Sequence, residues 1–252
     1  MNDGDFIRID YEMSVGEDRK LVSTNKEDLA KQNNIYDEHM KYKDAVVIVG
    51  SEGLFKELND SFKNAEVGKE VEVRIEPENA YGLRDPKNVK VHNIREFQRL
   101  NIEPEVGKEV TINNRRGRII SVTPGRVLVD YNHQWAGKPV FYKYTVKGVI
   151  TDDTEKVKAI IDMYYSIDSS EFGVSVTDRE IRIRIPENSK FDAAWIEAKF
   201  RIVSDLRKYE KGKDIVIEEF YEAQKEEPKE EKKEEAQEKP QEESTEANAA
   251  GQ

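Results

Sequence analysis

Residues 127–138 read VLVDYNHQWAGK, a short apolar strand that runs into a polar, glycine-containing turn. A second short motif, Ala80-Tyr81-Gly82, precedes this run. Between the two motifs, from about Asp85 to Asp130, the pattern of apolar and turn residues changes. Further towards the N-terminus lie Val67-Gly68-Lys69 and the opening strand Ile7–Tyr11. The two central motifs therefore flank a piece of chain with its own character, which predicts a unit inserted into a host domain.

The composition indicates a soluble protein. Hydrophobic and charged residues each make up 37% of the 252 residues, and no stretch approaches the roughly 18 apolar residues of a membrane span. The lack of cysteine excludes a disulfide framework, a thiolate metal site and a cysteine nucleophile. The acidic start Met1–Asp5 has neither the basic residues nor the apolar core of a signal peptide, so we expect a cytoplasmic protein with no membrane partner.

The net charge of −11 is unevenly distributed. Residues Glu222–Gln252 contain eleven glutamates and five lysines, which gives this segment a net charge of −6 and leaves the rest of the chain only mildly acidic. The segment has no aromatic residue and cannot bury enough apolar surface to offset its ordering entropy, so we expect a disordered acidic tail. The basic cluster Arg115–Arg118 is interpreted as a solvated turn, and no nucleic-acid partner is predicted.

The first part of the chain predicts short strands around one helix. Phe6–Tyr11 and Glu70–Ile75 alternate apolar and polar residues, as half-buried strands do, and Val46–Val49 has the composition of a buried strand. Leu54–Ala65 places apolar residues at helical spacing and ends before Gly68. A lone helix beside antiparallel strands favours an α+β half-barrel, to which the alternating strand Val140–Val149 returns.

The piece between the two motifs predicts a small β-unit. Ile94–Leu100 is expected to be a short helix, and the strand candidates that follow it are Glu109–Ile112, Arg118–Val122 and Arg126–Val129. Gly117 and the pair Pro124-Gly125 are expected to form the turns between these strands.

A third block follows the returning strand. The expected helices are Val157–Tyr165 and Phe191–Tyr209, and the expected strands are Val174–Val176, Ile181–Ile185 and Ile215–Ile217. Nothing in the composition of this block names its partner.

The four motifs at residues 7–11, 67–69, 80–82 and 127–138 resemble those of the FKBP-type peptidyl-prolyl cis-trans isomerases, within them the SlyD-like branch and its long archaeal-type members. The resemblance implies an FKBP-like antiparallel half-barrel with one helix, an inserted β-rich flap domain and a small mixed α/β C-terminal domain. The implied boundaries are 1–85 plus 131–151 for the discontinuous FKBP domain, 86–130 for the flap (chaperone) domain, 154–221 for the C-terminal domain and 222–252 for the tail.

The resemblance also implies a reaction that needs no cofactor, metal or nucleophile. An X-Pro bond isomerises over a barrier of about 18–20 kcal/mol and takes tens to hundreds of seconds unaided. The twisted transition state has lost amide resonance and carries less charge on its carbonyl oxygen, so an apolar, water-poor pocket favours it over the planar amide. The implied partners are unfolded or partly folded proteins with X-Pro bonds, together with an unnamed partner of the C-terminal domain.

The resemblance assigns the site residues one by one. Tyr81 corresponds to the tyrosine whose hydroxyl donates to the substrate carbonyl, and the backbone amide of Phe55 corresponds to a second donor. The residues that correspond to the substrate-binding pocket are Tyr11, Leu21, Val22, Leu54, Leu58, Trp135 and Tyr142.

Two positions depart from the family pattern. Val22 stands where the family has a carboxylate thought to act on the twisting carbonyl, and Glu57 stands where it has a glycine. These departures predict a weakened isomerase with chaperone activity. The alternative is a non-catalytic holdase or adaptor that keeps the scaffold without its chemistry.

The inserted unit is expected to hold unfolded segments near the pocket by strand addition or apolar contact. The apolar residues assigned to this surface are Val89, Val91, Ile94, Phe97, Ile119 and Val122. Metal binding is not expected, because His39 and His92 have no partners at metal-ligand spacing and His133 is interpreted as a structural hydrogen-bonding group in its turn.

Overall fold

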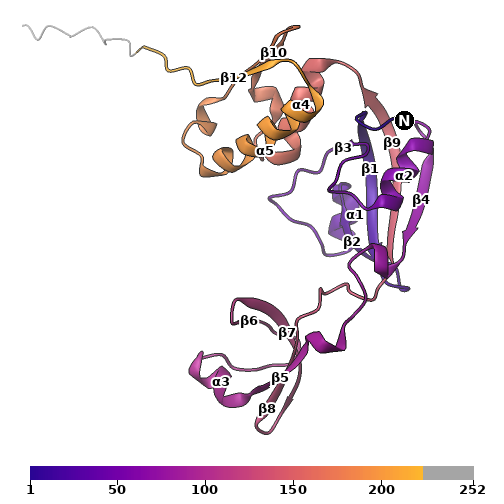
Figure 1. Ribbon diagram of the computed structural model, residues 1–252, viewed down its shortest axis with the longest axis vertical. Helices are drawn as coiled ribbons and strands as arrows, with labels where there is room; N and C mark the ends of the chain where they lie inside the picture. Colours follow the sequence, from indigo (N-terminus) through magenta and orange to yellow (C-terminus); the bar gives the residue numbers. More distant parts are fainter. Residues whose placement is uncertain (224–252) are drawn as a thin grey trace, which may run out of the picture. The chain divides into compact units, whose positions relative to one another are not determined.

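The computed structural model describes residues 1–223, whose strands form three β-sheets (Figure 1). The buried apolar side chains of these residues form three clusters. Met1–Glu219 form one compact unit. The expected mixed α+β class with antiparallel strands is confirmed. The expected disordered tail at 222–252 lies, apart from its first two residues, outside the described residues.

The first sheet is built around its N-terminal strand. β1 (Phe6–Val15) pairs along its whole length with β9 (Val140–Ile150), and on its other edge with β2 (Lys20–Thr24) and β3 (Ala45–Ile48). β4 (Glu70–Ile75) completes the sheet on the far side of β9. β1, β4 and β9 confirm the strands predicted from alternating hydrophobicity, and β3 confirms the predicted buried strand. β2 was not predicted.

Two helices belong to this part of the chain. The predicted helix is α2 (Lys56–Asn64), which buries Leu58 and Phe62 against the sheet. A second helix, α1 (Glu27–Gln32), was not predicted; it fully buries only Ala30, so the sequence carries no apolar stripe that would reveal it.

The inserted sheet has the strand order β5-β8-β7-β6. Its elements are β5 (Val89–Asn93), α3 (Ile94–Arg99), β6 (Glu109–Ile112), β7 (Arg115–Thr123) and β8 (Arg126–Asp130).

One turn of this sheet differs from the prediction. Gly117 lies inside β7 rather than in a turn, and the β6–β7 hairpin turns at Asn113-Asn114, both of which have positive φ. Asparagine tolerates this left-handed conformation, which the tight hairpin turn requires. Gly117 instead allows a close approach, because a Cβ there would lie 2.6 Å from Val129 and 2.8 Å from the ring of Tyr131.

The expectation that Phe97 and Ile119 are exposed is wrong. Both are fully buried and form the core of the inserted sheet together with Val110, Ile112, Val127 and Val129. A small sheet covered by one short helix needs its largest apolar side chains inside, since little else is available to fill the core.

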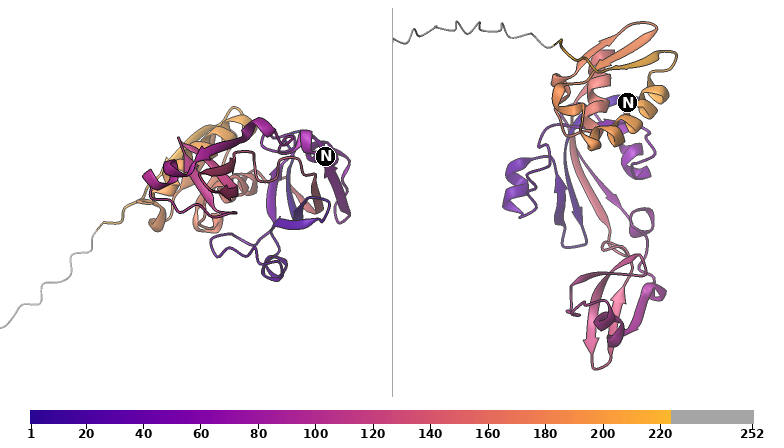
Figure 2. Two further views of the ribbon diagram at one scale, coloured as in Figure 1. Left: turned by 90° about the horizontal axis from the view of Figure 1, so that it is seen from below. Right: turned by 90° about the vertical axis from the view of Figure 1, so that its left-hand side faces the viewer.

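The chain enters and leaves the inserted sheet through two segments that are hydrogen-bonded to each other (Figure 2). The Asn132 side chain donates to the carbonyl of Asp85 at 2.9 Å and accepts from its backbone N–H at the same distance. Gly137 N–H donates to the Gly82 carbonyl at 2.8 Å. The ends of the insertion are therefore held together at the edge of the host.

The C-terminal block comprises α4 (Asp153–Tyr164), α5 (Ala193–Tyr209) and a three-stranded sheet. The sheet contains β10 (Gly173–Val176), β11 (Glu180–Arg184) and β12 (Asp214–Glu218), with β11 and β12 parallel. All five elements were predicted. The described residues also contain four short 3-10 helices: Pro77–Asn79, Pro86–Asn88, Ser169–Glu171 and Glu187–Ser189.

The core of the C-terminal block also contains side chains from the first sheet. Phe6, Ile48 and Ile150 are buried in the same cluster as Trp195 and Ile202 of α5. The first sheet and the C-terminal block therefore share one hydrophobic core. Over the described part of the chain, no helix is both long and apolar enough to cross a membrane.

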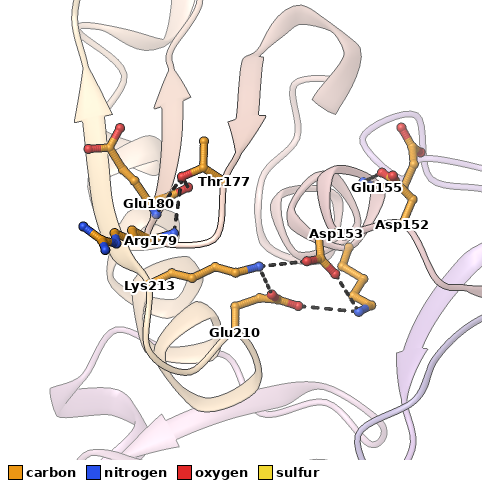
Figure 3. A network of polar contacts seen from close by, with 9 residues as sticks. Asp152, Asp153, Glu155, Thr177, Arg179, Glu180, Glu210 and Lys213 are labelled. Carbon is orange, nitrogen blue, oxygen red and sulfur yellow. Dashed lines mark hydrogen bonds and ion pairs between the residues drawn. The ribbon is translucent and has the colours of Figure 1, made fainter.

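An ion-pair network closes the junction between α4 and the end of α5 (Figure 3). Lys213 Nζ donates to Asp153 at 2.8 Å and to Glu210 at 3.0 Å, and Lys156 Nζ lies 3.0 Å from Asp153. The Glu210 side chain is only 7% exposed, so burying it is costly unless these lysines pair with it.

We expect Lys213→Met to lower the free energy of unfolding by about 2–3 kcal/mol, because it leaves the buried Glu210 carboxylate with only the more distant Lys156. Urea denaturation measures the change. The matched control is Lys211→Met, at a lysine exposed to solvent. Equal losses in the two variants would contradict a special role for the network.

Candidate functional site

Eight of the nine predicted site residues belong to one apolar cluster on the first sheet. Leu58 is buried in this cluster, and the partly buried members packed against it include Tyr11, Val22, Leu54, Phe55, Tyr81, Trp135 and Tyr142. They come from β1, β2, the start of α2, the turn after Pro77–Asn79, the loop before β9, and β9 itself. Residues far apart in sequence therefore meet at one place.

Leu21 is the exception. It is 9% exposed but belongs to none of the three apolar clusters. The pairing of β2 with β1 shifts register at Val22, since Met13 pairs with Ser23 and Ser14 pairs with Leu21, and this irregularity interrupts the alternation of faces at Leu21 and Val22.

Five aromatic side chains form what we call the aromatic cup: Tyr11, Phe55, Tyr81, Trp135 and Tyr142. The Tyr142 ring centroid lies 6.2 Å from that of Phe55 and 6.4 Å from that of Tyr11. Phe55 meets Tyr81 edge-on at 5.6 Å, and Tyr81 meets Trp135 edge-on at 4.9 Å. These are favourable aromatic geometries, and each ring is held in place by another.

The hydroxyl groups of Tyr81 and Tyr142 stay protonated. Burial raises the pKa of Tyr81 and raises the pKa of Tyr142 further. A protonated hydroxyl can donate a hydrogen bond, which is the role that the family resemblance implies for Tyr81.

His133 is a neighbour of the site whose contact the sequence did not predict. Its ring stacks on Tyr81 with a centroid distance of 4.3 Å and an interplanar angle of 3°. Its Nδ1 accepts from the backbone N–H of Trp135 at 3.3 Å. The sequence feature that could have indicated this contact is the position of His133 in the polar turn of residues 127–138. The fold brings this turn beside the Ala80-Tyr81-Gly82 motif.

The two departures from the family pattern have different surroundings. Val22 is half-buried against the apolar cluster, and its neighbour Ser23 supplies a hydroxyl that hydrogen-bonds the Tyr11 hydroxyl at 2.9 Å. Glu57 Oε1 accepts from the Asn79 side chain at 2.5 Å, whereas Oε2 is buried and has no hydrogen-bond partner among residues 1–223. Glu57 therefore ties the start of α2 to the segment that carries Tyr81.

The surface of the inserted sheet exposes a different set of apolar residues from the predicted one. Val91 is 62% exposed, while Val89, Ile94 and Val122 are half-buried and Phe97 and Ile119 lie in the core. The exposed apolar side chains that the sequence missed are Leu100, Val106 and Ile120. Leu100 and Val106 lie in turns, and Ile120 lies on the solvent face of β7. In turns no periodicity distinguishes exposed from buried residues.

The chemistry available to the aromatic cup is differential binding. Apolar walls and hydroxyl donors can favour a twisted amide over a planar one without covalent chemistry. Among residues 1–223 no group of three or more His, Cys, Asp or Glu side chains is placed to hold a metal ion.

Comparison with known families finds three matches along the chain. A model of the FKBP-type peptidyl-prolyl cis-trans isomerase family matches residues 1–100. A model described as FKBP26, IF domain matches residues 90–135, and one described as FKBP26_C-terminal matches residues 153–222.

Two curated proteins are similar to the chain. The short-type peptidyl-prolyl cis-trans isomerase of Methanocaldococcus jannaschii is 35% identical over 144 residues, which cover 57% of this chain and 89% of that protein. The FKBP-type peptidyl-prolyl cis-trans isomerase SlyD of Helicobacter pylori is 26% identical over 132 residues, which cover 50% of this chain and 70% of that protein.

Proposed function

The chain belongs to the FKBP-type peptidyl-prolyl cis-trans isomerase family, and we propose that it isomerises X-Pro bonds of unfolded proteins in the aromatic cup while the inserted sheet holds those proteins nearby. The proposed domains are 1–85 with 131–151, 86–130 and 154–221. We propose the cytoplasm as its location.

The aromatic cup is the observation that carries this proposal. Its five rings come from separate elements yet contact one another in a continuous series from Tyr11 to Trp135. A prolyl ring is apolar and fits such walls, and the Tyr81 hydroxyl supplies a donor for the carbonyl. We propose Tyr81 and Phe55 as the catalytic residues and the other members of the cup as substrate-binding residues.

The proposed isomerase activity is weakened because Val22 supplies no carboxylate. We expect Val22→Asp to raise kcat/KM for a prolyl tetrapeptide by about tenfold, which corresponds to 1.36 kcal/mol of transition-state stabilisation. Val22→Asn is the matched control, since it has the same shape without the charge. A gain in neither variant, with peptide binding intact, would favour the pure holdase.

The inserted sheet is proposed to recruit clients through its exposed apolar residues, among them Val91 and Val106. Holding a client beside the cup raises its effective concentration there. Deleting residues 88–129 and bridging the ends with a short Gly-Ser loop is expected to lower kcat/KM on an unfolded protein by at least about tenfold.

The tetrapeptide rate is the internal control for this deletion, because a tetrapeptide is too short to reach both the cup and the inserted sheet. If turnover of the unfolded protein is untouched by the deletion, the recruiting role is wrong.

The experiment that tests the proposed function is the refolding of a protein limited by a slow prolyl bond, with and without this chain. Acceleration in proportion to catalytic amounts of the chain is the expected result. Slowed refolding, or suppressed aggregation only at stoichiometric amounts, would instead make the chain a holdase on an inherited scaffold.

A further inference from the structure

A cavity of about 480 Å³ lies where the first sheet meets the C-terminal block. We call it the junction cavity. One side is formed by Met40 and by Ala45 and Val46 of β3, and the other by Met163 and Tyr164 at the end of α4. Tyr11 of the aromatic cup also lines it, so the cavity begins where the proposed catalytic site ends.

The walls of the junction cavity are fixed relative to each other. Val46 packs against the shared core, and Phe6 beside it meets Tyr209 of α5 edge-on at 5.7 Å. Lys41 Nζ donates to the Ile167 carbonyl at 2.8 Å, which ties the segment before β3 to the segment that follows α4. A ligand that binds here therefore meets a preformed surface and does not have to order it.

The charged groups around the junction cavity neutralise one another. The Asp162 side chain, only 6% exposed, lies 2.7 Å from Lys43 Nζ and 3.3 Å from Lys41 Nζ and accepts from the Ser169 hydroxyl. Burial alone would raise the pKa of Asp162, but the hydrogen bonds from Lys43 and Ser169 outweigh it and hold the pKa below its usual value. The carboxylate therefore stays paired, and the remaining surface is available for apolar contact.

Methionine is concentrated at this place. Met40 and Met163 are two of the four methionines in the chain, and they line the cavity from opposite walls. The unbranched, polarisable methionine side chain adapts to partners of different shape, as at surfaces that bind many sequences.

We propose that the junction cavity is a subsite for the client polypeptide, in which a large aliphatic side chain binds a few residues away from the proline held in the aromatic cup. The proposal rests on the isomerase function proposed above and narrows its substrate class. Extended segments that carry both a proline and a nearby Leu, Ile or Met are the preferred clients. The C-terminal block thereby contributes directly to substrate selection.

The test compares a prolyl tetrapeptide with a set of longer peptides that carry either Leu or Lys at successive positions on each side of the proline. For the wild-type chain, one Leu position is expected to raise kcat/KM by about tenfold over the Lys peptide, since burying a leucine side chain is worth at least one factor of ten in binding. Met163→Glu is expected to abolish this Leu preference.

Two further variants complete the design. Met40→Glu changes the opposite wall from an exposed loop position, so it tests the cavity even if Met163→Glu disturbs α4. Ile196→Glu introduces the same charge at an exposed apolar position of α5 outside the cavity and should leave the Leu preference unchanged. A Leu preference that survives in both methionine variants, or that is absent from the wild type, overturns the proposal.

Failure of the isomerase function is distinguishable from failure of the subsite. If the wild type turns over neither peptide, the proposed catalysis is wrong. Fluorescence anisotropy of the labelled long peptides then tests whether the cavity binds the Leu side chain. Tighter binding of the Leu peptide that is lost in Met40→Glu supports the subsite, and equal binding of the Leu and Lys peptides overturns it.

Discussion

Replacing Tyr142 by alanine is expected to lower kcat/KM for a prolyl tetrapeptide by about a hundredfold, or about 2.7 kcal/mol of transition-state stabilisation. Tyr142 lies between Phe55 and Tyr11 in the aromatic cup and contacts both. Its truncation removes one wall and admits water, which weakens the preference for the less polar, twisted amide. A coupled or direct tetrapeptide assay measures the change.

Tyr142→Phe is the control that separates the ring from its hydroxyl. It keeps the wall of the aromatic cup and should retain activity within about threefold, or well under 1.36 kcal/mol. A loss as large as that of the alanine variant would show that the hydroxyl, not the apolar wall, acts on the substrate. Urea denaturation of both variants checks that the fold is intact, because truncating a buried aromatic side chain also destabilises the protein.

Trp195→Ala is expected to lower the free energy of unfolding by about 3–5 kcal/mol. Trp195 is 2% exposed and contacts Tyr165 and Phe172 at ring-centroid distances of 5.2 and 5.3 Å. Because its cluster includes Phe6 and Ile48, the loss should also destabilise the first sheet. Urea denaturation followed by tyrosine fluorescence and by isomerase activity should show both signals shifting together.

Trp195→Phe provides the matched comparison. The Trp195 Nε1 group is buried and has no hydrogen-bond partner within the described part of the chain, so its removal relieves an unpaired donor while most of the ring volume is kept. We expect a loss below about 1.5 kcal/mol for this variant. If activity is retained while the C-terminal block unfolds in Trp195→Ala, the two parts do not depend on a common core.

The strands could be predicted because their signal is local. Alternation along Phe6–Tyr11 and Glu70–Ile75 arises from the side-chain period of a strand. The family motifs then brought together Tyr81, Trp135 and Tyr142 from three segments, and the structure places all three in one cluster.

What the sequence did not predict depends on contacts between distant residues. Glycine is typical of turns, but Gly117 lies within a strand. A glycine is needed there because the Tyr131 ring packs against it and leaves no room for a side chain. Phe97 and Ile119 could not be told from exposed residues without knowing which face of the inserted sheet the short helix covers. The stacking of His133 on Tyr81 and the core shared by Phe6 and Trp195 likewise arise only when separate segments meet.

The pairing of β1 with β9 sets an order of events during translation. The N-terminal strand leaves the ribosome early, but its full-length partner, Val140–Ile150, emerges only after the whole inserted sheet has been made. The inserted sheet has partners close in sequence and can close first, because short loops are quickly formed. Until β9 arrives, one long edge of β1 lacks its strand, so the nascent protein is itself an aggregation-prone client of the kind it is proposed to assist.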